Sequence, residues 1–259
     1  MEAKLYVILG SHACRTGMLL LEHKGIDYER VELPTALHPF ALRLRGFAGN
    51  PTTFRELDDR PHRMLGLADR FGTVPALVID GRQVKTNRRI ARVLDELRPD
   101  PPLFPVDEDR RREVEEAERW GDEVFQMAAR RLALAAALHG PDALLNRADD
   151  GRLGPLLWRN QIVRLMGTRF LALTVFAANK GAESELLASL PGMLDRVDGW
   201  VEAGVLNGDE LYAADFMIAP SLGLLCYLRD LRPELEGRPA MRLVDRVLPD
   251  PTAVGGVRA

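Results

Sequence analysis

Residues 72–81 constrain the fold of this chain most strongly, because the dipeptide Val74-Pro75 stands directly before the apolar run at residues 76–79. Proline cannot donate a main-chain hydrogen bond, so it is excluded from the interior of a buried strand. Pro75 therefore indicates either a trans proline at the start of a strand or a cis Val74-Pro75 bond at the mouth of one. In the cis form the N–H and C=O groups of Val74 point outward, where an extended ligand can pair with them like an added strand.

The N-terminal part has a β-α-β pattern. A buried strand is predicted at residues 4–9, a helix at 14–24 and an alternating strand at 28–33. Ser11 stands at the N-cap of this helix, where its hydroxyl also meets the positive end of the helix dipole. Gly25 closes the helix.

A hairpin and a helix follow. Strands predicted at 76–79 and 83–85 flank an Asp-Gly turn at residues 80–82, and the next helix is predicted at 88–97. The proline-rich stretch at 99–105 cannot continue a helix and indicates a linker. The remainder shows helical patterns at residues 113–138, 153–176, 183–203 and 214–228. The sequence thus predicts a small α/β domain joined to an all-helical one.

Composition excludes several classes of protein. The 259 residues are 46% hydrophobic and carry a net charge of −3, with arginines interspersed among acids, so nucleic acid is not expected as a partner. The most apolar stretch, at 170–178, is far shorter than the roughly 20 residues of a membrane span, and no signal peptide is evident. Cys14 and Cys226 form neither a metal-ligand nor a disulfide pattern. We expect a cytoplasmic protein without a metal or a membrane partner.

Four motifs, in this order, resemble the glutathione transferase superfamily. They are Gly-Ser-His-Ala-Cys at residues 10–14, Glu-His-Lys-Gly-Ile-Asp-Tyr at 22–28, Thr-Val-Pro-Ala-Leu at 73–77 and Ile-Ala-Arg-Val-Leu-Asp-Glu-Leu at 90–97. Residues 211–216 are similar to the helix N-capping box of that family, with Tyr212 in place of the usual Ser or Thr and Asp215 at the helix start. The resemblance covers most of the chain.

This resemblance implies an α/β thioredoxin-like N-terminal domain and an all-α helical-bundle C-terminal domain. The expected boundaries are residues 1–98 for the thiol-binding domain, 99–106 for the linker, 107–235 for the helical domain and 236–259 for a C-terminal extension. It also implies a homodimer.

The resemblance places a serine-type active site at Ser11. Transfer of a thiol requires its thiolate, and a hydrogen-bond donor near a helix N-terminus lowers the pKa of a thiol. Ser11 is therefore expected to donate to the sulfur of a bound thiol, with a plain N-cap serine as the alternative. Cys14 occupies the position of the resolving cysteine of a dithiol glutaredoxin, but a Ser-x-x-Cys arrangement cannot complete an internal disulfide cycle.

Five further residues are expected to bind the thiol: His12, Val74, Pro75, Thr86 and Asn87. The family holds the γ-glutamyl end of glutathione with an acidic or amide residue followed by serine, where this chain has Thr86-Asn87. Asn87 can donate to a carboxylate, whereas Thr86 offers no partner for an ammonium group, and Arg88 and Arg89 add positive charge beside the pocket. The expected ligand is glutathione or another low-molecular-weight thiol such as mycothiol.

The second substrate is expected between the first domain and the first helices of the second. These helices present Trp120, Asp122, Phe125, Gln126 and Arg130 with helical spacing. Of these residues, Trp120 and Phe125 are candidates to line an apolar pocket, although aromatic residues at helical spacing also suit a core. Arg130 and Arg131 are expected on a solvated or ion-paired face.

The sequence therefore favours an enzyme that transfers a small thiol to a hydrophobic electrophile. Two alternatives remain open. One is a non-catalytic binding or scaffold protein that kept the fold, and the other is a thiol redox protein that depends on Cys14.

Overall fold

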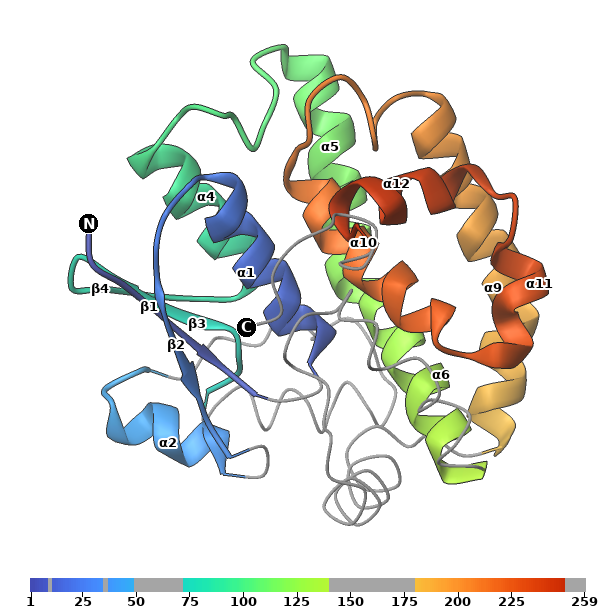
Figure 1. Cartoon of the computed structure of the whole chain (residues 1–259), viewed down its shortest axis with the longest axis horizontal. Helices are drawn as coiled ribbons and strands as arrows, with labels where there is room; N and C mark the ends of the chain where they lie inside the picture. The colour runs from blue at the N-terminus through green and yellow to red at the C-terminus, as the bar shows by residue number, and fades with distance from the viewer. Residues whose placement is uncertain (9–10, 35–36, 49–71, 140–179, 250–259) are drawn as a thin grey trace.

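Four strands form a mixed sheet in the N-terminal part of the chain (Figure 1). The computed structural model describes residues 1–8, 11–34, 37–48, 72–139 and 180–249. The strand order is β2-β1-β3-β4, where the strands are β1 (Ala3–Val7), β2 (Glu29–Glu32), β3 (Ala76–Ile79) and β4 (Arg82–Lys85). β2 runs parallel to β1, and β3 is antiparallel to both β1 and β4. The predicted β-α-β opening is confirmed, because helix α1 (His12–His23) connects β1 to β2.

The hairpin between β3 and β4 turns at Asp80 and Gly81, as predicted. Their φ angles are 46° and 80°. Two consecutive residues with positive φ are what a two-residue type I′ turn requires, and Asp-Gly tolerates this conformation. A carboxylate oxygen of Asp80 also accepts a hydrogen bond from the N–H of Glu2 at 2.8 Å, which ties the turn to the chain that enters β1.

Alternate side chains of the sheet belong to two different hydrophobic cores, and in Figure 1 helices α1 and α4 lie on one side of the sheet and α2 on the other. Leu5 and Leu77 belong to the large hydrophobic core, which also contains residues of α1 and α4 (Asn87–Leu97). Tyr6 and Val78 pack against a smaller core around Leu42 of α2 (His38–Leu44). The two-residue period of a strand produces this division. The sheet with its helices has the thioredoxin-like arrangement that the sequence predicted.

The rest of the described chain is helical and packs around one buried helix. That helix is α10 (Ala213–Cys226), whose residues are buried from Ala213 to Leu225. The other elements are α5 (Glu108–Trp120), the π-helix η2 (Gly121–Phe125), α6 (Gln126–His139), α9 (Lys180–Glu202), the 3₁₀ helix η6 (Arg229–Leu231), α11 (Arg232–Leu235) and α12 (Pro239–Val247). None of the helices in the described ranges has the length and apolar content that crossing a bilayer demands.

The first long helix differs from its prediction at both ends. It begins at Glu108 rather than at residue 113, because the Asp107 side chain caps it by accepting a hydrogen bond from the N–H of Arg110 at 2.9 Å. It does not continue unbroken to residue 138, since η2 separates α5 from α6. The helix predicted at residues 153–176 lies outside the described part of the chain. Helix α12 lies within the expected extension from residue 236 and contributes Leu243 to the core.

Asp215 starts α10 in the structural role that the sequence predicted. Its carboxylate accepts hydrogen bonds from the N–H groups of Tyr212, at 2.7 Å, and Asn207, at 2.6 Å. The hydroxyl of Tyr212 donates to Glu210 and does not cap the helix. The acidic half of the capping box is thus present without its hydroxyl half.

Candidate functional site

Ser11 caps the N-terminus of α1, as predicted. Its side-chain oxygen accepts a hydrogen bond from the N–H of Cys14 at 3.3 Å, and its carbonyl oxygen accepts from the same N–H at 3.0 Å. The backbone at Ser11 is extended, with φ −98° and ψ 104°, which is usual for an N-cap residue. The side chain is partly exposed. A ligand can therefore reach the hydroxyl at the positive end of the helix dipole.

Cys14 is a core residue in this structure. It is fully buried, and burial raises the pKa of its thiol to about 11, which hydrogen bonding from Ser11 offsets only in part. A thiol with this pKa is protonated at neutral pH, and a protonated buried thiol is a poor nucleophile. The geometry therefore disfavours the alternative in which Cys14 carries redox chemistry.

The Val74-Pro75 peptide bond is cis, the form that the sequence left as one of two options. Among the described residues, no hydrogen bond to the main chain of Val74 is found. Pro75 packs against α1, because a Cβ atom added at Gly17 would lie only 3.2 Å from the Cβ of Pro75. The N–H and C=O groups of Val74, which have no partner among the described residues, therefore lie next to Pro75, and Pro75 contacts α1.

Asn87 does not lie as the sequence suggested. It is buried, and its side-chain Nδ2 donates a hydrogen bond to the carbonyl oxygen of Ala13 at 2.9 Å. This amide ties the start of α4 to the first turn of α1, so it is engaged within the protein rather than held out for a carboxylate. Thr86, the preceding residue, is partly exposed and has a φ of 67°, a conformation that a β-branched residue rarely adopts.

The positive charge that Arg88 was expected to add beside this site is compensated. Its guanidinium forms ion pairs with Glu123 at 3.2 Å and with Glu118 at 3.5 Å. Glu118 is fully buried and also accepts two hydrogen bonds of 2.8 Å from Arg92. These ion pairs join α4 of the N-terminal part to α5 and η2 of the helical part. The charge of Arg88 therefore stabilises the packing of these helices.

Trp120 and Phe125 belong to the hydrophobic core. Phe125 is fully buried, and its ring stacks on Trp120 with centroids 5.2 Å apart. Trp120 in turn meets Trp200 of α9 edge to face at 5.3 Å. Aromatic rings that pack on one another in this way are typical of an interior, and the apolar substrate pocket expected at these residues stays a prediction.

His12 is buried beside the start of α6. Its Nε2 atom has no hydrogen-bond partner in the described part of the chain, and the carbonyl group of Gln126 faces its ring. Burial lowers the pKa of His12 to about 3, and the positive charge of Arg130 acts in the same direction. The imidazole is therefore neutral at neutral pH.

Gln126 and Arg130, which the sequence places on the helices at the expected second-substrate site, both act on His12 in the first turn of α1. The guanidinium of Arg130 donates to the side-chain oxygen of Gln126 at 3.1 Å, and its charge acts on both His12 and Cys14. Arg130 was expected on a solvated or ion-paired face. The π-helix η2 changes the direction of the side chains that follow it, and no pattern in the sequence announces such an insertion.

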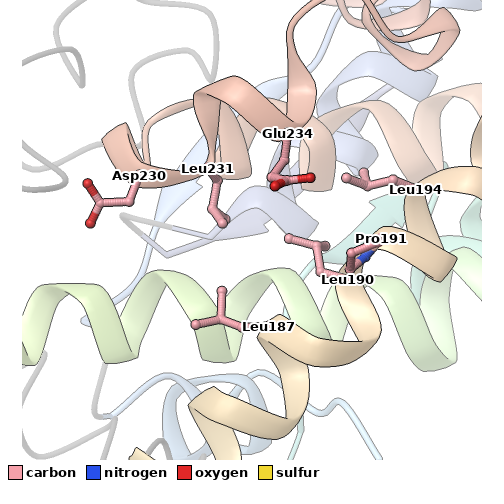
Figure 2. Close-up of a pocket in the computed structure, with 7 residues that line it drawn as sticks. All are labelled: Leu187, Leu190, Pro191, Leu194, Asp230, Leu231 and Glu234. Carbon is pink, nitrogen blue, oxygen red and sulfur yellow. The ribbon is translucent and has the colours of Figure 1, made fainter.

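A pocket of about 220 Å³ lies elsewhere, between α9 and the segment formed by η6 and α11 (Figure 2). It is lined by Leu187, Leu190, Pro191, Leu194, Asp230, Leu231 and Glu234. Figure 2 shows Leu187 and Leu231 pointing toward one another, whereas Asp230 points away. No residue of α1, and neither Val74 nor Pro75, lines this pocket, and it is smaller than typical sites for small molecules. Within the described ranges, no cluster of three or more His, Cys, Asp or Glu residues could hold a metal ion.

Comparison with known proteins identifies the N-terminal part. Residues 5–102 match the family model described as glutathione S-transferase, N-terminal domain. A glutathione S-transferase from Rhodospirillum rubrum has a TM-score of 0.60 at 21% identity, with 96% of this chain and 89% of that chain covered. One from Ceriporiopsis subvermispora, in complex with glutathione, has a TM-score of 0.60 at 16% identity, with 95% and 98% covered.

The fold also occurs in an enzyme that is named as a β-etherase and not as a glutathione S-transferase. The β-etherase LigF from a Sphingobium species has a TM-score of 0.52 at 18% identity, with 95% of this chain and 99% of that chain covered. Identities this low describe a shared fold. No curated protein matches the chain.

Proposed function

We propose that this protein binds a low-molecular-weight thiol and transfers it to an electrophile, because residues 5–102 match the model of the glutathione S-transferase N-terminal domain and solved glutathione S-transferases share the fold of the chain. In this proposal the hydroxyl of Ser11 donates to the sulfur of the bound thiol and stabilises its thiolate. The thiolate then attacks the electrophilic carbon, and the leaving group departs with the electron pair of the broken bond.

The position of the Ser11 hydroxyl supports this proposal above all. Ser11 is partly exposed at the N-cap of α1, and its side-chain oxygen accepts a hydrogen bond from the N–H of Cys14 at 3.3 Å. The hydroxyl therefore keeps its own proton to donate. A thiolate bound at the N-terminus of the helix would be a charged acceptor for that proton.

The proposed thiol enters as an extended ligand beside Val74. Its main-chain N–H and C=O would pair with those of Val74, for which the described residues provide no partner. Glutathione is the first candidate, because a structure of the same fold holds it. Mycothiol stays the second, because Thr86 offers no charge for an ammonium group and Asn87 is bonded to Ala13.

The reaction proposed first is conjugation. Cleavage of an ether by the same thiolate is an equally direct use of Ser11, and an enzyme named as a β-etherase shares the fold. The rival from another class is a non-catalytic binding protein, for which the engaged side chain of Asn87 is the supporting observation.

An assay with an activated aryl chloride, 1-chloro-2,4-dinitrobenzene, tests the proposal with glutathione and with mycothiol. Wild-type protein, Ser11→Ala, Ser11→Thr and Cys14→Ala would be compared by kcat/KM and by the pKa of the bound thiol, read from its thiolate absorbance. A hydrogen bond to a charged group contributes roughly 1.5–3 kcal/mol. Ser11→Ala should thus lower kcat/KM by about 10- to 100-fold and raise the thiol pKa by about 1–2 units.

The remaining variants separate the competing interpretations. Ser11→Thr keeps a hydroxyl and should retain most of the activity. Loss of activity in Cys14→Ala alone would favour the redox protein, and inactivity of the wild type with every thiol would favour the binding protein. We also propose a homodimer, which light scattering after size-exclusion chromatography can measure.

A further inference from the structure

The cavity between α9 and the segment formed by η6 and α11 has a largely apolar lining (Figure 2). Leu190, Leu194 and Leu231 line it and are buried, whereas Leu187 is 42% exposed. The volume is about 220 Å³, and an apolar cavity of about 150 Å³ holds a benzene ring. The space therefore suits one aromatic ring with a short chain, a ligand smaller than those of typical drug-binding pockets.

The polar side chains that line this cavity are hydrogen-bond acceptors. Besides leucines and a proline, the lining holds the carboxylates of Asp230 and Glu234, so none of its side chains carries an N–H or O–H donor. Figure 2 shows the carboxylate of Glu234 turned toward Leu194, whereas Asp230 points away. A negatively charged wall of this kind attracts a cation and repels an anion.

The carboxylate of Glu234 has no ion pair or hydrogen bond within the described ranges of the chain. Arg238, four residues further on, donates its Nε–H to the main-chain carbonyl oxygen of Glu234 at 2.7 Å. The Nη1 of Arg238 binds Asp195 at 2.8 Å and Asp198 at 2.6 Å instead of the Glu234 carboxylate. Arg232, two residues before Glu234, does not line the cavity. A cationic ligand would therefore meet a carboxylate without a competing partner among these residues.

Pro191 leaves a second acceptor at the same cavity. It stands inside α9 and has no N–H, so the carbonyl oxygen of Leu187, four residues earlier, lacks its usual intrahelical hydrogen bond. A helical carbonyl points along the axis toward the residue four positions later, and both Leu187 and Pro191 line the cavity. The carbonyl oxygen of Leu187 therefore lies on the face of α9 that borders the cavity.

We infer that this cavity binds a small apolar cation, a primary ammonium group on a short chain that ends in an aromatic ring. The ring packs against Leu190, Leu194 and Leu231, and the ammonium group donates to the carboxylate of Glu234 and to the carbonyl oxygen of Leu187. A primary ammonium group carries three donors and no acceptor, which matches a lining that offers acceptors alone. No residue of the proposed thiol site lines this cavity, so the inference does not depend on the transfer reaction.

A matched set of ligands tests the charge requirement. 2-Phenylethylammonium, 2-phenylethanol and 3-phenylpropanoate share the ring and a chain of similar length, and they carry a positive charge, no charge and a negative charge. Isothermal titration calorimetry with the full chain, without any thiol, would measure their dissociation constants. Because charge-assisted hydrogen bonds are stronger than neutral ones, the ammonium compound should bind about tenfold or more tighter than the alcohol. The carboxylate compound should bind more weakly than the alcohol.

Glu234→Gln and Glu236→Gln form a matched pair of variants. Both remove one negative charge from an exposed residue of the same segment, but Glu236 does not line the cavity. Glu234→Gln should weaken binding of the ammonium compound by about tenfold or more and that of the alcohol by less than about twofold. Glu236→Gln should leave both unchanged. Pro191→Ala restores an N–H partner for the carbonyl of Leu187 and should weaken binding of the ammonium compound by about two- to tenfold.

Leu187→Trp tests where the ligand binds. The larger side chain would fill the cavity from a partly exposed position, so it should remove binding of both the ammonium compound and the alcohol. Equal affinities for the three ligands, equal effects of Glu234→Gln and Glu236→Gln, or undiminished binding to Leu187→Trp would each overturn the inference. Circular dichroism of every variant checks that the fold is retained.

Discussion

Thr86 holds a conformation that costs free energy. Its φ of 67° and ψ of 139° lie in a region that is nearly reserved for glycine, and the branched Cβ of threonine makes it less favourable still. Such strain amounts to about 1–3 kcal/mol per residue and is found mostly near ligand sites. Thr86→Gly should therefore raise the free energy of unfolding by about 1 kcal/mol, after the greater flexibility of glycine in the unfolded chain is subtracted. Urea denaturation measures this change.

Thr86→Ala is the matched control. It removes the hydroxyl and the methyl group but keeps the Cβ atom that causes most of the strain, so it should raise the free energy of unfolding by clearly less than Thr86→Gly does. An equal gain in both variants would show that the branched side chain, and not the backbone conformation, is unfavourable at this position.

Among the elements, η2 depends on the absence of a side chain at Gly121. A Cβ atom built there would lie 2.8 Å from Cγ1 of Ile218 and 3.2 Å from Cγ of Met217, both on the buried helix α10. Neither atom is at a free end of a side chain, so one of the helices must shift. Gly121→Ala should lower the free energy of unfolding by about 1–3 kcal/mol, the usual effect of overpacking a core.

Gly199→Ala provides a control of opposite sign. Gly199 also lies within a helix, α9, but a Cβ atom there would meet nothing within 4 Å. Alanine should therefore stabilise α9 by about 0.5–1 kcal/mol. If Gly121→Ala and Gly199→Ala changed the free energy of unfolding in the same direction, the close approach of η2 to α10 would not explain the effect of Gly121→Ala.

At the scale of the whole molecule, Lys24 joins the end of α1 to α4 and to the chain that leads into α5. Its side chain is fully buried, and its ammonium group donates to Asp95 at 2.6 Å, to the carbonyl oxygen of Arg98 at 2.7 Å and to that of Pro101. Lys24→Met keeps the apolar stem but removes the ammonium donor from both carbonyl oxygens and from Asp95, which keeps only the hydrogen bond from the N–H of Leu103 at 2.7 Å. Removing one partner of a buried pair costs about 3–5 kcal/mol, and the lower end applies here because Asp95 is partly exposed.

Lys4→Met is the comparison for Lys24→Met. Lys4 also forms ion pairs, with Glu29 at 3.2 Å and Glu2 at 3.5 Å, but its side chain is 39% exposed. Because an exposed ion pair contributes little, its removal should change the free energy of unfolding far less than Lys24→Met does. Similar losses in the two variants, measured in urea, would contradict a special role for the buried lysine.

The features that could be predicted from the sequence are those that depend on contacts between residues close together in the chain. Ser11 could be placed because an N-cap bonds to a residue three positions later, and the Asp80-Gly81 turn because its conformation suits those two residues. Sequence reasoning could not find that Asn87 bonds to Ala13, 74 residues away, or that Trp120 packs on Trp200, because these contacts join distant parts of the chain.

The sequence by itself determined the order of the elements, the cap of α1 and the cis-compatible turn before β3, because each depends on contacts within a few residues. Only the tertiary structure decided that Cys14 is buried, that Phe125 is part of the core and that Arg130 meets His12. The physical reason is that burial and charge environment are set by helices packing across the fold, and the π-helix before α6 changes which side chains they present.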